Sequence, residues 1–177
     1  MVSIINMEVV MAAGYFGIGI ENSKTPMNIG TLWRSAYMFD ASLLFTIGRR
    51  YEKQASDNVG AAKHLPLMNF RVLEDFWNAI PHGCMVIGVE LDEKAIPLRR
   101  FSHPDRCIYL LGAEDHGLTK AAREKCHRLV VLPGKASVNV AVAGSIVMCH
   151  RVMQRQREEA LLAHAPDKIR HQLGLKE

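Results

Sequence analysis

The sequence predicts an α/β domain built on a mostly parallel β-sheet with helices on both faces. Short, almost continuously apolar segments alternate along the chain with amphipathic or polar segments. Strands that are apolar on both sides suit a sheet buried on both faces, and parallel strands need long crossover connections. We therefore expect one domain over residues 14–162, with an extension over residues 1–13 and a charged tail over residues 163–177.

The composition is that of a globular protein that does not enter the membrane. Hydrophobic residues make up 49% of the 177 residues and charged residues 23%, which is enough for a sizeable core. No apolar run approaches the roughly 18 residues that cross a bilayer, and no export signal precedes the first strand. These features predict a cytoplasmic protein. The formal net charge of +4 fits an anionic partner and equally fits solvated surface charge.

The four cysteines give no indication of a metal site or a disulfide framework. They are widely spaced, without the close pairs that are typical of zinc sites. Three of them lie within apolar runs, where a reduced cysteine behaves as a small hydrophobic residue. The four are Cys84, Cys107, Cys126 and Cys149.

The first half of the chain contains two predicted strands, a helix and a long polar segment. We expect a strand over Gly14–Ile20, a helix that begins after Asn28, and a strand over Ser42–Ile47. The glycines of the first run lie inside the strand and not after it, which excludes a phosphate-binding loop there. Asn28 is a candidate cap for the helix, and Arg34 is its only cation. The polar stretch that runs to about Asn69 is longer than most connections.

The second half repeats the alternation. We expect strands over Cys84–Glu90, Cys107–Leu111 and His127–Leu132, short helices over Val72–Ala79 and about Thr119–Lys125, and a linker over Leu91–Arg106. The polar turn Leu132–Asn139 then leads into a helix that reaches Leu162. Its apolar residues at helical spacing are Val138, Val142, Ile146 and Cys149. Gly144 inside this helix costs about 1 kcal/mol relative to Ala, so we expect it to mark close packing.

Polar residues cluster at three strand-to-loop junctions, and ligands of open parallel sheets bind beyond the carboxyl ends of the strands. Each candidate also has a plainer interpretation. Arg34 can be a solvated helix cation, and Glu114 can accept backbone amides in its own turn. Ser137 and Asn139 can be helix caps. The joint occurrence of an arginine, a glutamate, a serine and two asparagines favours one shared crevice.

These three junctions resemble, in order, the three motifs of the SpoU/TrmH branch of SPOUT RNA methyltransferases. The matching segments are Asn28–Ala36 (NIGTLWRSA), Leu110–Leu118 (LLGAEDHGL), and Leu132–Pro133 with Ser137–Ala143 (SVNVAVA). The resemblance spans Tyr15 to about Arg151. Three motifs in the correct order are far more specific than one.

The resemblance implies an S-adenosylmethionine-dependent RNA ribose 2′-O-methyltransferase, with tRNA favoured over rRNA as substrate. It also implies a homodimer and a C-terminal deep trefoil knot (the SPOUT, or α/β-knot, fold) that binds the cofactor. By the same resemblance, the catalytic residues are Arg34, Asn28, Glu114, Ser137 and Asn139. The cofactor-binding residues are Val89, Leu111, Gly112, Leu132, Ser137 and Val138.

The resemblance leaves the role of Arg34 open. The family mechanism makes this arginine a general base, yet a guanidinium holds its proton above a pKa of roughly 12. Gripping an RNA phosphate and orienting the ribose is an equally good role. The turn Gly134–Ala136 is shorter than in many family members, which leaves the cofactor contacts there open.

No separate RNA-binding domain is expected, so cations of the domain itself would hold RNA phosphates. The candidate patches are Arg49-Arg50-Lys53, Arg99-Arg100, and Arg151 with Arg155 and Arg157. Each patch can equally be solvated surface charge. Two rival functions remain. One is a knotted RNA-binding module without turnover. The other is a flavodoxin-like small-molecule or nucleotide enzyme, although no glycine-rich phosphate loop follows the first strand.

Overall fold

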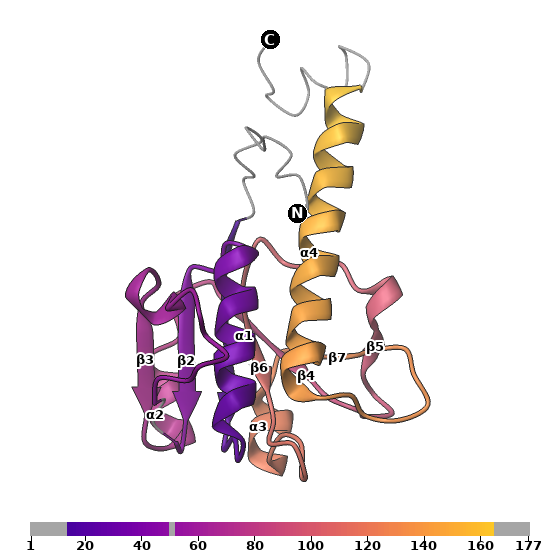
Figure 1. The fold of residues 1–177 in the computed structure, drawn as a ribbon. Helices are drawn as coiled ribbons and strands as arrows, with labels where there is room; N and C mark the ends of the chain where they lie inside the picture. The colour runs from indigo at the N-terminus through magenta and orange to yellow at the C-terminus, as the bar shows by residue number, and fades with distance from the viewer. Residues whose placement is uncertain (1–13, 50–51, 165–177) are drawn as a thin grey trace.

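A computed structural model describes residues 14–49 and 52–164, which form one sheet between two layers of helices (Figure 1). The strands are β1 (Tyr15–Glu21), β2 (Leu43–Ile47), β3 (Leu67–Phe70), β4 (Met85–Val89), β5 (Ile96–Pro97), β6 (Arg106–Leu111) and β7 (Arg128–Val131). The helices are α1 (Pro26–Met38), α2 (Leu73–Asn78), α3 (Lys120–Lys125) and α4 (Val140–Ala163), with 3-10 turns η1 (Ala61–Lys63) and η2 (Leu98–Arg100).

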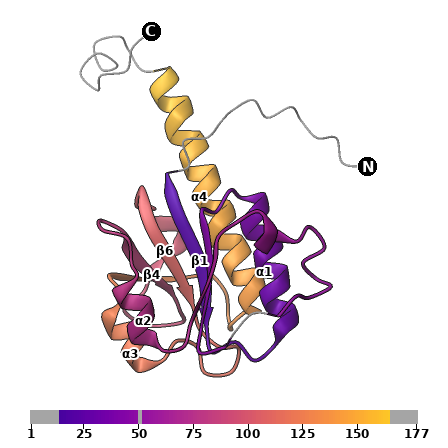
Figure 2. The same ribbon diagram turned by 90° about the vertical axis from the view of Figure 1, so that its left-hand side faces the viewer.

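The seven strands are ordered β3-β2-β1-β6-β4-β7-β5, and every pair is parallel. The predicted parallel α/β sheet is therefore confirmed. Helices α1 and α4 lie side by side on one face of the sheet, and α2 and α3 lie on the other (Figure 2). No helix among the described residues is long and apolar enough to span a membrane.

The central strands supply both halves of the core, because alternate side chains point to opposite faces. On β6, Cys107, Tyr109 and Leu111 face the α1–α4 layer, whereas Ile108 and Leu110 face the α2–α3 layer. Burial of one such side chain stabilises the fold by about 1.5–3 kcal/mol. The continuous apolar runs predicted as strands are buried for this reason.

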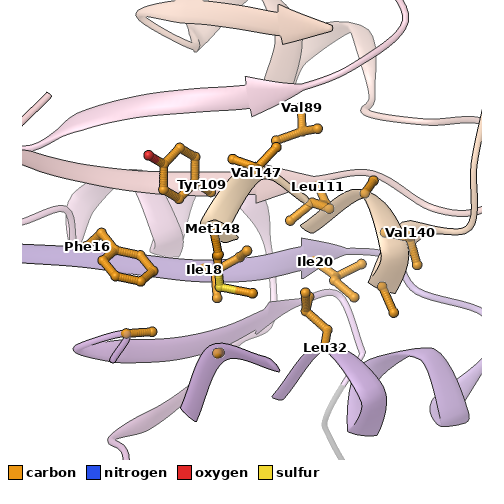
Figure 3. Close-up of a cluster of buried hydrophobic side chains, with 14 of the residues drawn as sticks. Phe16, Ile18, Ile20, Leu32, Val89, Tyr109, Leu111, Val140, Val147 and Met148 are labelled. Atoms are coloured by element: carbon orange, nitrogen blue, oxygen red, sulfur yellow. The ribbon is translucent and has the colours of Figure 1, made fainter. Parts of the chain in front are cut away.

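Helix α4 packs closely on the sheet through its first turns. Figure 3 shows Val140, Val147 and Met148 of α4 beside Ile18 of β1 and Leu111 of β6. Gly144 lies in the same contact. A Cβ at this position would be 2.4 Å from Leu32 Cδ1 and 3.3 Å from Ile18 Cδ1. The predicted packing reason for this glycine is confirmed.

The outward side of α4 corrects one interpretation of the sequence. Val138, Val142 and Ile146 were candidates for the inner side of a buried helix, yet they are 48%, 46% and 40% exposed. The buried side is offset by one or two residues and contains Val140 and Val147. The first turns of α4 are apolar around most of the circumference, so the pattern could not indicate which side meets the core.

Two further predictions are incomplete or wrong. The polar stretch before Asn69 and the linker after Leu91 contain the short strands β3 and β5, which the sequence did not predict. Both lie at the edges of the sheet, where only one neighbour is present and a long apolar run is not needed. Asn28 does not cap α1. The N-cap residue is Thr25, and Pro26 takes the first helical position, where its lack of an N–H costs nothing.

Two arginines of the candidate RNA patch on α4 are also structural. Arg151 is 0% exposed and donates hydrogen bonds to the carbonyls of Pro104 (2.7 Å) and Asp105 (3.1 Å). Arg155 is largely buried and pairs with Asp105 and Glu158. Neither guanidinium is free to hold RNA. Arg157, Arg49 and the pair Arg99-Arg100 are exposed, whereas Arg50 lies outside the described residues.

Candidate functional site

A cavity of about 560 Å³ opens beyond the carboxyl ends of β4, β6 and β7. This is the edge of a parallel sheet where ligands bind, and the volume suits a ligand of nucleoside size. All six residues that the sequence indicated for the cofactor line it: Val89, Leu111, Gly112, Leu132, Ser137 and Val138. Glu114 and Asn139 line it as well. Three stretches of the chain, residues 89–91, 111–123 and 131–143, therefore converge on one space.

A chain of hydrogen bonds joins the three sequence motifs at the rim of this cavity. The Asn139 amide donates to Asn28 Oδ1 at 2.9 Å, and the Asn28 amide donates to Glu114 Oε1 at 2.8 Å. Asn139 also caps α4, since its Oδ1 accepts from the Ala141 amide at 2.9 Å. Asn139 therefore serves as helix cap and cavity residue at once, whereas Asn28 serves the network in place of the predicted cap.

Glu114 receives several donors from the loop that precedes α1. Its carboxylate accepts from the backbone amides of Lys24 (3.0 Å) and Thr25 (3.2 Å) and from the Ser23 hydroxyl (3.3 Å). Desolvation raises the pKa of Glu114, but the hydrogen bonds from Lys24, Asn28 and Thr25 outweigh it, and the net pKa lies below its usual value. The carboxylate is therefore ionised at neutral pH. The amides of Lys24 and Thr25 belong to a different loop, so the role of Glu114 is not confined to its own turn.

Two more carboxylates hold the loop after β6, and the sequence did not single them out. Glu21 accepts from the Thr119 amide at 2.9 Å and from the Thr119 hydroxyl at 2.8 Å. Glu90 lines the cavity and accepts from the Leu118 amide at 2.5 Å. Each glutamate ends or directly follows a continuously apolar strand, which is the signal that could have found them. Together they fix the loop that presents Glu114.

Glycines allow this loop to approach its neighbours. A Cβ on Gly112 would lie 1.9 Å from the carbonyl carbon of Gly117. With any larger residue at position 112, the two ends of this turn could not approach each other as closely. Gly117 has a φ of +65°, and a Cβ there would lie 2.4 Å from the Glu90 carboxylate. Both positions need glycine on steric grounds. The close turn Gly112–Gly117 is thus encoded by its sequence.

The structure does not bring Arg34 into the cavity of its own chain. Arg34 is exposed on α1 and does not line the cavity, and no hydrogen bond or ion pair joins it to another described residue. Asn28 bonds to α4, and Ser35 Oγ accepts from Ser145 Oγ of α4 at 2.8 Å. Because Arg34 is rotated about 100° from Ser35 around the helix, it faces away from α4.

The chemistry of the cavity rests on carboxylates, amides, one hydroxyl and apolar walls. Within residues 14–49 and 52–164, no group of three or more His, Cys, Asp or Glu residues is placed to hold a metal ion. Ser137 lines the cavity and is exposed. Asp115 beside it pairs with Lys24, whose hydrogen bond lowers the pKa of that carboxyl. The lining thus combines the carboxylates Glu90, Glu114 and Asp115 and the cation Arg123 with apolar residues such as Val89, Leu111 and Leu132.

Comparison with known proteins adds a family match. Residues 16–149 match the SpoU rRNA Methylase family. The chain is 33% identical over 73 residues to the 23S rRNA (guanosine-2′-O-)-methyltransferase RlmB of Acinetobacter baylyi, covering 40% of this chain and 29% of that protein. It is 26% identical over 150 residues to an uncharacterized tRNA/rRNA methyltransferase of Mycolicibacterium paratuberculosis, covering 78% and 47%. The chain thus spans less than half the length of these two relatives.

Solved structures share the fold. The SpoU methyltransferase AviRb from Streptomyces viridochromogenes is similar with a TM-score of 0.72 at 23% identity, over 81% of this chain and 61% of that one. A structure described as giving insights into the 2-OH methylation of C/U34 on tRNA is similar with a TM-score of 0.69 at 18% identity, over 80% and 97%. At these identities the likeness concerns the architecture.

Proposed function

The chain belongs to the SpoU rRNA Methylase family, and from this premise we propose that it transfers a methyl group from S-adenosylmethionine to a ribose 2′-hydroxyl of RNA. The observation that carries the proposal is the hydrogen-bonded path Asn139–Asn28–Glu114, which unites three distant motifs at the rim of one cavity. We favour tRNA over rRNA, because this chain covers 97% of a structure whose description concerns tRNA. The RlmB relative supports rRNA as the second candidate.

The cavity suits the proposed cofactor in shape and charge. S-adenosylmethionine is a cationic sulfonium that carries its own activated methyl group. Apolar side chains of Val89, Leu111 and Leu132 can enclose the adenosine, while the carboxylates in the lining favour a positive ligand. Free backbone groups of the turn Pro133–Val138, which is exposed at the mouth, can bond to the polar ends of the cofactor.

The chain's own residues would order the rim of the site. Asn139 is fixed by its bonds to the start of α4 and to Asn28, so its orientation is set before a substrate arrives. The ionised Glu114 holds Asn28 and the loop before α1 in place. Ser137 presents a hydroxyl to the cavity. We propose that Arg34 grips an RNA phosphate and orients the ribose, because it is exposed and bonded to no described residue.

We propose that Arg34 completes the cavity of a second copy of the chain. It does not line its own cavity, and exposed hydrophobic residues lie on the same helix. Helices α1 and α4 lie next to each other (Figures 1 and 2), and exposed hydrophobic residues occur on α1 and in and just before α4. They are Met27, Met38, Val138, Val142, Ile146 and Met153. Several exposed hydrophobic residues on two adjacent helices are typical of an interface, and a homodimer would cover them.

We also propose the deep trefoil knot of the family. Its support is the arrangement of the C-terminal half of the chain. In the sheet the strands lie in the order β1-β6-β4-β7. The chain leaves β7, turns through residues 132–139, and then packs against α1 as helix α4. A knotted chain pulled from both ends keeps a tightened knot. Its extended length would then be measurably shorter than about 3.3–3.6 Å per residue in a single-molecule stretching experiment, and full extension would exclude the knot.

The catalytic proposal is tested with Arg34→Ala. We expect this variant to bind S-adenosylmethionine in calorimetry as the unchanged protein does, and to lose methyl transfer to RNA by about a hundredfold or more. Arg34→Lys is the matched variant, because it keeps the charge and loses the bidentate fork. Full activity of Arg34→Ala would exclude Arg34 from the site. No transfer of labelled methyl into bulk small RNA by the unchanged protein would favour the non-catalytic RNA-binding module.

The dimer is tested separately with Ile146→Glu. A buried charge at a dimer interface is strongly unfavourable, so we expect monomers in sedimentation analysis and a fall in methyl transfer. Lys120→Glu on α3 is the control, because it introduces the same residue on the opposite helix layer. A mixture of the two impaired variants Arg34→Ala and Asn139→Ala should regain activity, since one of the two sites in each mixed dimer is then intact. Absence of regained activity would place Arg34 in its own chain's site.

A further inference from the structure

An aromatic pair lies at the surface next to Arg34, on the side of α1 that faces away from α4. The rings of Tyr37 and His64 have centroids 4.9 Å apart and an interplanar angle of 33°. Tyr37 is 39% exposed, and His64 is exposed as well. Arg34 precedes Tyr37 by three residues on α1, so the two share one side of the helix. Lys63, also exposed, is the neighbour of His64.

The pair is held in place by the segment that carries His64. Ser56 Oγ donates to the Met27 carbonyl at 2.8 Å, and Gly30 leaves the space that this segment fills, since a Cβ there would be 2.3 Å from Ser56 Oγ. The buried Asp57 carboxylate accepts from the Ala61 amide at 2.9 Å and fixes the start of η1. The two rings are therefore positioned by docked backbone on both sides.

Two cations flank the pair, and the exposed carboxylate of Asp40 follows Tyr37 by three residues. Neither α1 nor residues 61–65 contain a carboxylate, and their cations Arg34 and Lys63 form no ion pair with another described residue. If this contact served only to pack η1 on α1, apolar and buried side chains would be sufficient. Exposed rings with polar edges, flanked by two available cations, instead suit a ligand that has a flat face and phosphates.

We propose that Tyr37 and His64 form a stacking platform for an unpaired base of the substrate RNA, with Lys63 and Arg34 on the adjoining phosphates. This inference rests on the proposed function, because it assumes that RNA approaches Arg34. The platform would hold a base next to the target nucleotide. It selects single-stranded over duplex RNA, since only an unpaired base exposes its face to a protein ring.

The experiment measures binding of a labelled single-stranded oligouridine and of an RNA duplex of equal length by fluorescence anisotropy. Stacking of a base on an aromatic ring is worth about 1–3 kcal/mol, so we expect Tyr37→Ala to weaken oligouridine binding about 5- to 100-fold. Tyr37→Phe keeps the ring and should stay within about twofold. Duplex binding should not change in either variant. Lys63→Ala should reduce the slope of log affinity against log salt by about 0.7, whereas Lys120→Ala should not.

A direct readout is photocrosslinking of the unchanged protein to oligouridine that contains 5-iodouridine. We expect the crosslinked peptide to contain Tyr37 or His64. Unchanged oligouridine affinity in Tyr37→Ala, or a crosslink confined to other segments, would overturn the platform. Affinity that depends on Tyr37 in a protein that neither binds S-adenosylmethionine nor methylates RNA would instead overturn the proposed function and leave the platform standing.

Discussion

Helix α4 carries two polar networks with opposite design. At its start, Asn139 joins Asn28 and Glu114 at the open rim of the cavity. Further along, His150 and Arg151 join His103 and Tyr109 beneath the helix, where Tyr109 and Arg151 have no exposed surface. The first network leaves hydrogen-bonding capacity toward the cavity. The second is buried, and its hydrogen bonds join groups within the protein.

The inner network has a consistent direction of donors. Arg151 donates to the Tyr109 hydroxyl at 3.3 Å, which leaves the phenol proton for His103 Nδ1 at 2.5 Å. His103 Nε2 can then donate to His150 Nδ1 at 2.8 Å. Desolvation first, and then the charges of His150, Arg151 and Arg155, lower the pKa of His103 to about 3. A buried network whose histidine stays uncharged stabilises the fold, whereas an open network at the cavity rim is suited to a ligand.

The largest expected effect comes from breaking the inner network with Arg151→Leu. The substitution leaves two carbonyls and the Tyr109 hydroxyl buried without their donor, and loss of one partner of a buried charged contact costs about 3–5 kcal/mol. Urea unfolding measures the change. Arg157→Leu on the exposed part of α4 is the control and should stay within about 0.5 kcal/mol. Equal stability of the two variants would contradict the structural role of Arg151.

A smaller effect is expected from acid. The pKa of His103 is lowered in the folded protein, so the unfolded chain binds more protons at pH values between about 6.5 and 3. The contribution of His103 to stability is fully present above pH 6.5 and is lost as the pH falls through this window, by at most about 1.4 kcal/mol per pH unit. Desolvation also lowers the pKa of His150, so the contribution of His150 to stability is likewise lost as the pH falls.

Denaturant unfolding between pH 7 and pH 5 measures this slope. The variant His103→Asn should show a flatter dependence on pH than the unchanged protein, whatever its absolute stability. Equal slopes would show that the inner network does not exclude protons. The pKa of Glu114 is also lowered, and its contribution is lost only at more acidic pH, as the pH falls below the usual value of 4.5.

The smallest effect on stability is expected at the rim. Asn139→Ala removes a helix cap and should cost about 1 kcal/mol, together with a roughly tenfold to hundredfold loss of methyl transfer. Asn139→Asp separates the two roles. Aspartate keeps the oxygen that caps α4 but loses the amide that donates to Asn28. We expect nearly full stability and low activity, and an active Asn139→Asp variant would exclude the Asn139–Asn28 contact from the mechanism.

The sequence predicted most of the sheet because its central strands are buried on both faces and therefore read as continuous apolar runs. It missed β3 and β5, where an edge position relaxes that demand. It also indicated the six cavity residues and the Asn28, Glu114, Ser137 and Asn139 set through motif resemblance, and four of its five catalytic candidates lie at or beside the cavity. The sequence did not indicate the roles of Glu21 and Glu90, because a single carboxylate after a strand does not show which distant amide will donate a hydrogen bond to it.

The sequence by itself determined the α/β class, the strand-to-loop junctions that carry the polar residues, and the need for a small residue at Gly144. These features depend on local periodicity and on the chemistry of short segments. The tertiary structure decided which side of α4 is buried, that Arg151 is structural, and that Arg34 does not line its own cavity. The reason is that the contact partners of an apolar or charged side chain are fixed only when the helices pack on the sheet.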